Sequence, residues 1–87
     1  MNIVEQIENL IPQIVTKKPL PMEEIFKAVK IRLRLLKYTW DEDDDLWHQV
    51  YAIVNDLVVS KTGIVRIRTF GLKREYLLKE TYDKIFI

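Results

Sequence analysis

The spacing of the apolar residues in this chain changes once, near Gly63, and this change limits the folds open to it. Before Gly63, apolar residues recur every three or four positions, as on one face of an α-helix. After it, in 64–70 (IVRIRTF), alternate positions include Arg66 and Arg68, which indicates the two-residue period of a β-strand with unlike faces. We therefore expect helices followed by a β-hairpin, which is an α+β fold.

The first expected helix covers residues 2–16. Pro12 lies inside this pattern and lacks a backbone donor, so we expect a kink or an end near Leu10–Ile11. The connector 17–21 (KKPLP) follows, and its prolines favour extended backbone. A short extended segment of this kind is expected to be able to pair with the edge of a sheet.

Two further helices are expected before Gly63. One begins at Pro21 or Met22, with acidic residues in its first turn. The other runs from about residue 45 to 60 and is apolar over more than half its circumference, which is typical of a central core helix. We expect it to be capped by one of three aspartates and to end with Gly63 in the left-handed conformation. The three candidate caps are Asp41, Asp43 and Asp44.

The hairpin is expected to place Gly71 in its turn and to return through 74–78 (REYLL). In one register Arg66 or Arg68 lies across from Glu75, a pair that contributes a fraction of a kcal/mol. The helices and the hairpin together predict a core of nine residues. They are Ile25, Phe26, Val29, Val50, Ile53, Val54, Leu57, Val65 and Tyr76.

The 87 residues are 48% hydrophobic and 31% charged, which predicts a single globular domain over 1–87. The absence of cysteine excludes disulfides and thiolate metal sites. No apolar run approaches the roughly 20 residues of a membrane-spanning helix. The opening MNIVEQIENLIP is acidic where an export signal is basic, so we expect a cytoplasmic, intracellular protein without a membrane partner.

The order of helix, extended segment, helix, helix and hairpin resembles the winged helix–turn–helix family over about residues 3–78. The segments with this resemblance are 19–29 (PLPMEEIFKAV), 50–67 (VYAIVNDLVVSKTGIVRI) and 74–78 (REYLL). The resemblance implies a three-helix core with a C-terminal β-hairpin wing. It also implies a third helix that reads DNA bases in the major groove, while the second helix and the wing contact phosphates.

Carried over to this sequence, the resemblance implies one set of nucleic-acid-binding residues in three places. They are Lys27, Lys30, Arg34 and Lys37 on the second helix, Gln49 and Asn55 on the third, and Arg66, Arg68, Lys73 and Arg74 at the wing. The amides suit adenine and the cations suit phosphate. The third helix departs from the pattern, because Asp56 and the run 41–45 (DEDDD) repel phosphate and no Lys or Arg lies within 41–60.

Two functions remain open at this stage. The first is a small DNA-binding protein, a homodimer that acts as a transcription regulator or a DNA-associated accessory factor on double-stranded DNA. The second is a protein–protein interaction or dimerisation module without nucleic-acid binding, which the net charge of only +1 and the apolar ending KIFI favour. The second-helix cations are then a solvated face, and Arg66 and Arg68 protect a sheet edge from aggregation.

No enzyme is expected. His48 is the only histidine, and no nucleophile accompanies it. The run 41–45 lacks the ligand spacing, the glycine and the distal glutamate of a calcium loop, so capping and solvation account for it better than a metal. With two glycines in the chain, a phosphate-binding loop of backbone amides is nearly excluded, and we expect no cofactor and no small-molecule substrate.

Overall fold

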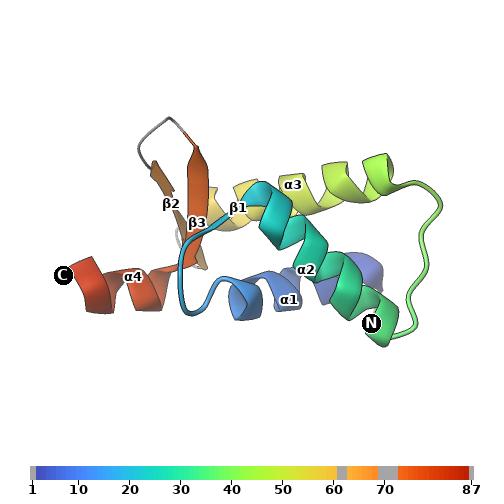
Figure 1. The fold of residues 1–87 in the computed structure, drawn as a ribbon, viewed down its shortest axis with the longest axis horizontal. Helices are drawn as coiled ribbons and strands as arrows, with labels where there is room; N and C mark the ends of the chain where they lie inside the picture. The colour runs from blue at the N-terminus through green and yellow to red at the C-terminus, as the bar shows by residue number, and fades with distance from the viewer. Residues whose placement is uncertain (1, 61–62, 69–72, 87) are drawn as a thin grey trace.

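The computed structural model describes residues 2–60, 63–68 and 73–86, and within them the chain is α+β as expected. The described residues form four helices and three short strands (Figure 1). In order they are α1 (Ile3–Ile14), β1 (Leu20–Pro21), α2 (Met22–Leu35), α3 (Asp43–Val59), β2 (Ile64–Arg68), β3 (Arg74–Leu78) and α4 (Lys79–Phe86). None of the helices in these residues is long and apolar enough to cross a bilayer.

The three strands form one antiparallel sheet in the order β1-β3-β2. The connector before α2 supplies β1, in which Leu20 pairs with Tyr76 and Pro21 with Glu75. The prediction that this connector pairs with a sheet edge is therefore confirmed. It adds a strand to the side of β3 that β2 leaves open, and this holds the start of α2 against the hairpin.

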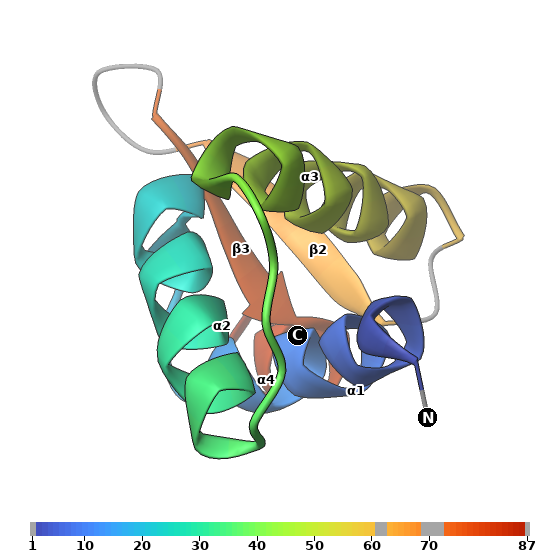
Figure 2. The ribbon, with the colours of Figure 1, turned by 90° about the vertical axis from the view of Figure 1, so that its right-hand side faces the viewer.

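Helices α1, α2 and α3 surround the core, with β2 and β3 behind them in the view of Figure 2. Six of the nine expected core residues are buried, namely Ile25, Val29, Val50, Ile53, Val54 and Tyr76. Phe26 and Leu57 are only partly buried at the rim of the core, and Val65 is half-buried. The prediction was wrong for Val65 because Ile64, one residue earlier, is the β2 residue that faces the helices.

The hairpin forms, but its register differs from the expected one. Arg66 pairs with Tyr76, Ile67 with Glu75 and Arg68 with Arg74, so Glu75 lies opposite neither arginine. Because opposite residues of an antiparallel pair share a face, Arg66 lies on the face that contains the buried Tyr76. The expected register is therefore wrong, and the positions of Arg68 and Arg74 stand opposite each other.

Three expectations about helix ends are also corrected. α1 does not stop at Leu10–Ile11 but continues through Pro12 to Ile14, because a proline removes only one helical donor and Val15 still donates to Ile11. α3 begins at Asp43, and its N-cap is Glu42, without a side-chain capping bond, rather than an aspartate. Gly63 does not adopt a positive φ, whereas Lys37 does, with a φ of 70° after α2.

α4 was not predicted from the sequence. It follows β3 directly and contacts both β2 and β3. The hydroxyl of Thr81 donates to the carbonyl of Thr16 over 2.5 Å, and the backbone N–H of Lys79 donates to the carbonyl of Gly63. These two hydrogen bonds hold the start of α4. Its far end extends away from the other helices (Figure 1), and Ile85 and Phe86 of the apolar ending are exposed there.

Candidate nucleic-acid interface

The hairpin of β2 and β3 places several of the predicted phosphate contacts in one region. Arg66 and Arg74 are exposed, and neither forms a salt bridge within the described residues. The register sets Arg68 opposite Arg74. Like charges in directly opposite positions destabilise a strand pair. The hairpin register therefore brings the positions of two predicted arginines together, and the predicted residue Lys73 directly precedes Arg74.

Tyr76 lies at the centre of this region and is almost fully buried. Its burial, and secondly the nearby Tyr51, raise the pKa of the Tyr76 phenol, while Arg66 and Arg74 partly oppose the increase. The phenol therefore remains neutral at physiological pH. The same interactions show that α3, through Tyr51, reaches the strands that contain the arginines.

An open hollow of about 230 Å³ lies where the hairpin, α3 and the start of α2 meet. Its described lining includes Tyr51 of α3, Glu23 of α2, Lys73, and Arg74 of β3. Sequence reasoning gave Tyr51 and Glu23 no role in binding. No local pattern connects residues 23, 51 and 74, so only the tertiary structure could bring them together.

Tyr51 is the outermost ring of an aromatic series that begins at the rim of the core. The rings of Phe26 and Trp47 meet edge to face with centroids 5.2 Å apart. Trp47 and Tyr51 are stacked with centroids 6.4 Å apart and an interplanar angle of 21°. Tyr51 is 38% exposed. These contacts hold the Tyr51 ring at the edge of the hollow.

The predicted phosphate contacts on α2 have a different environment, because carboxylates lie beside two of them. The ammonium of Lys27 is 3.8 Å from Glu24, and that of Lys30 is 3.2 Å from Asp43. Arg34 lies over the ring of Trp40, 5.3 Å from its centroid. The basic face of α2 is therefore partly neutralised by Glu24 of α2 and by Asp43, the first residue of α3.

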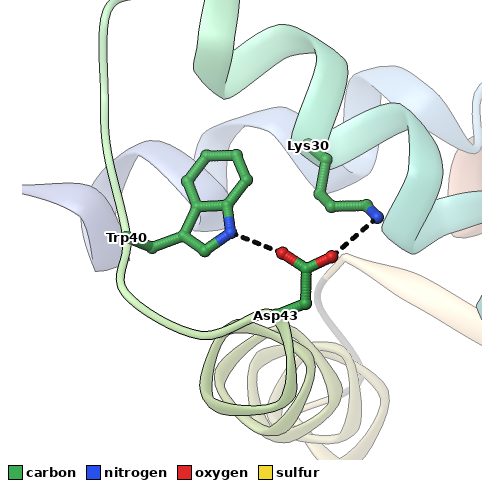
Figure 3. A network of polar contacts seen from close by, with 3 residues as sticks. All are labelled: Lys30, Trp40 and Asp43. Carbon is green, nitrogen blue, oxygen red and sulfur yellow. Dashed lines mark hydrogen bonds and ion pairs between the residues drawn. The ribbon is translucent and has the colours of Figure 1, made fainter.

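Figure 3 shows how Asp43 joins α2 to this connector. Its carboxylate accepts a 2.8 Å hydrogen bond from the indole nitrogen of Trp40 and a 3.2 Å bond from Lys30. The bond from Trp40, followed by the bond from Lys30, lowers the pKa of Asp43 below its usual value. The charged carboxylate is thus held against the basic face of α2, which places part of the acidic run 41–45 there.

The wing and the C-terminal part of α2 border different hollows. Glu23 is the charged α2 residue in the lining of the hollow beside Lys73 and Arg74, whereas Arg34 borders a separate hollow together with Trp40 and Asp43. Residues 23 and 34 are about 16 Å apart along the helix axis. Lys37, also predicted to bind phosphate, is exposed beyond the end of α2.

The two predicted base-reading residues of α3 are also apart. Gln49 is exposed and Asn55 is half-buried. At about 100° per residue, their side chains leave the helix in directions about 120° apart. One base-reading face containing both amides is therefore not formed.

Comparisons of the chain with protein-family models, with curated proteins and with solved structures found no match.

Proposed function

We propose that this chain is a winged-helix DNA-binding protein whose hairpin is the main contact with the phosphate backbone. The support for a winged helix is the element order α1-β1-α2-α3-β2-β3 together with the sheet order β1-β3-β2. In this proposal α1, α2 and α3 form the three-helix core, and the β2–β3 hairpin is the wing. The protein acts as a transcription regulator or as a DNA-associated accessory factor.

The exposure of two wing arginines, Arg66 and Arg74, is the observation that favours DNA most. Arg66 and Arg74 are exposed without a carboxylate partner in the described residues, and Arg68 stands opposite Arg74. A cluster of arginines costs stability when it has no counter-charge. The phosphates of a duplex supply that charge and suit the guanidinium group, which binds their oxygens in pairs.

The predicted contacts on α2 take a secondary part in this proposal. Lys30 must leave Asp43, or share its ammonium group, before it binds a phosphate. Lys27, Arg34 and Lys37 add to the electrostatic attraction for DNA. Gln49 and Asn55 add polar contacts, but their side chains leave α3 in different directions. Binding is therefore mainly electrostatic and depends only weakly on DNA sequence.

The experiment is a titration of a labelled blunt duplex at about 50 and about 200 mM salt, because each neutralised phosphate adds about −0.9 to the log–log salt slope. The variant R66A/R74A should bind more weakly by a similar factor on unrelated sequences, with a slope shallower by about 1 per lost contact. The matched control is K17A/K18A, which removes the same number of charges from the exposed connector before β1. No binding by the natural protein at the lower salt, or equal losses in both variants, contradicts the proposal.

We propose in addition that the protein forms a homodimer through α4, which a separate observation favours. Ile85 and Phe86 are each 59% exposed, and the rings of Phe86 and Tyr82 lie 4.8 Å apart between centroids. Exposed apolar groups gathered on one short helix are typical of an interaction surface. A symmetric dimer covers such a face with its own copy. This surface also supports the alternative function, an interaction module without DNA.

A further inference from the structure

The hollow beside Lys73 and Arg74 of the hairpin combines three chemical groups that blunt duplex binding does not require together. They are the aromatic ring of Tyr51, the cationic side chains of Lys73 and Arg74, and the carboxylate of Glu23. A site that contacted only phosphates would gain nothing from Glu23, which repels them. A ligand that explains all three has a flat ring, a negative charge and a hydrogen-bond donor.

A nucleotide with an unpaired base has these three properties. Its base stacks on an aromatic side chain whatever its identity, because every base has a π-face. Its phosphate binds Arg or Lys. The exocyclic amino group of cytosine or adenine donates a hydrogen bond, and a carboxylate is the acceptor that suits cytosine. Thymine lacks an amino group, so the same site favours cytosine over thymine.

We propose that the hollow binds one unpaired nucleotide of a DNA strand, with its base stacked on Tyr51, its phosphate on Arg74 and its amino group on Glu23. This inference rests on the proposed DNA-binding function and specifies its substrate as DNA with an overhang, a gap or a frayed end. In an intact duplex the base is enclosed by its stacked neighbours, and its release costs free energy. The protein therefore prefers DNA in which that base is already unpaired.

The structure prepares Tyr51 for this role. Its stacking on Trp47, which in turn meets Phe26, restrains the ring before any ligand binds. Glu23 lies in the first turn of α2, and β1, just before it, pairs with β3. Arg74 is the first residue of β3. The three groups are therefore held by packed elements of the fold, which reduces the ordering cost of binding.

The first test compares a blunt duplex with the same duplex carrying a short cytosine overhang, by fluorescence anisotropy. The natural protein should bind the overhang more tightly, by about 5- to 150-fold if one base stacks on Tyr51. Y51A should lose this preference, while Y51F, which keeps the ring, should retain it. An abasic overhang removes the base from the DNA instead of the ring from the protein. It should also lose the preference, and this result does not depend on any effect of Y51A on folding.

The second test examines Glu23 and the source of the nucleotide. The natural protein should bind a cytosine overhang more tightly than a thymine overhang, and E23A should bring the ratio of the two affinities close to one. Free deoxycytidine monophosphate is added as a competitor. It should displace the overhang only when in large excess, because it lacks the neighbouring phosphates.

The possible failures are distinguishable. Equal affinity for blunt, abasic and cytosine-ended DNA, unchanged in Y51A, overturns this inference and leaves the proposed DNA binding intact. Displacement by a small amount of the free nucleotide overturns the assignment to a DNA strand and assigns the hollow to a mononucleotide. Absence of binding to every DNA overturns the inference together with the proposed function.

Discussion

Asp43 illustrates how a single residue of the acidic run acquires a specific role. Its two oxygens accept from Trp40 and Lys30, so one carboxylate connects α2, the connector and the first turn of α3. The remaining carboxylates of 41–45 are exposed. Asp43 is thus the residue of this run that joins two helices, although its sequence context is the same as that of its neighbours.

We predict that D43N removes a part of the stability that depends on pH. The pKa of Asp43 is lowered in the folded protein, so its contribution is complete above the ordinary carboxyl pKa of 3.8 and is lost as the pH falls through the lowered value. The difference in unfolding free energy between natural protein and D43N should therefore be largest near neutral pH and shrink in acid. Urea unfolding at a series of pH values measures it.

The matched control is D44N, also in the first turn of α3, where it has the same favourable position at the helix N-terminus. Its difference from the natural protein should vary less with pH than that of D43N. Since Asp43 is exposed, the effect of D43N should be modest. Identical pH profiles for the two variants would show that the bonds to Trp40 and Lys30 contribute nothing.

At the scale of elements, α2 has one side that is buried in the core and another that is exposed. Leu33 is fully buried, whereas Leu35, two residues later, is 75% exposed. We predict that L33A lowers the free energy of unfolding by about 2–5 kcal/mol, because it leaves a cavity in the core. L35A should change it by less than about 0.5 kcal/mol. Denaturant unfolding of both variants gives the comparison, and a similar loss in L35A would contradict the position of α2.

The elements that the sequence predicted are those whose side chains face a core with a regular period. α2 and α3 were predicted nearly to their ends because residues such as Val29 and Val54 repeat at helical spacing. α4 was missed because it is short and none of its residues is buried. Its apolar residues, including Phe86, therefore do not repeat at helical spacing over enough residues to predict a helix. The register of the hairpin was wrong because it depends on the turn, and the neighbours of Arg66 change with one residue of shift.

The candidate site was predictable only in its residue types. The cations of the wing were expected from composition and alternation, and the hairpin does place Arg66 and Arg74 in one region. The contact of Lys30 with Asp43 spans 13 residues, and the hollow joins positions 23, 51 and 74. Such neighbours are decided by helix packing and not by local spacing, so the partial neutralisation of α2 and the position of Tyr51 became evident only in the folded chain.

At the scale of the whole molecule, α4 lies at one end of the long axis, which measures 40 Å (Figure 1). The first helix begins near the other end. A partner that binds α4 therefore leaves the far side of the helical core uncovered. In a symmetric dimer through α4, each copy keeps its own hairpin, and a long DNA can meet two wings at once.

We predict that this dimer is weak and depends on concentration. An eight-residue helix is about 12 Å long and offers only Tyr82, Ile85 and Phe86 as apolar contacts, far less than a standard interface of about 1,200–2,000 Å² requires. Sedimentation velocity should show monomer at low and dimer at high micromolar concentration. I85S/F86S should remain monomeric throughout without loss of helical content, because both side chains are exposed in the single chain.

The control for the dimer is V59S, which removes an exposed apolar side chain at the end of α3. It should leave self-association unchanged, since Val59 lies outside α4. If natural protein and I85S/F86S sediment alike at every concentration, α4 is not the contact. If the dimer forms and also binds DNA through both wings, I85S/F86S should lower the affinity for a long duplex more than for a short one, because only the long duplex gains from two linked contacts.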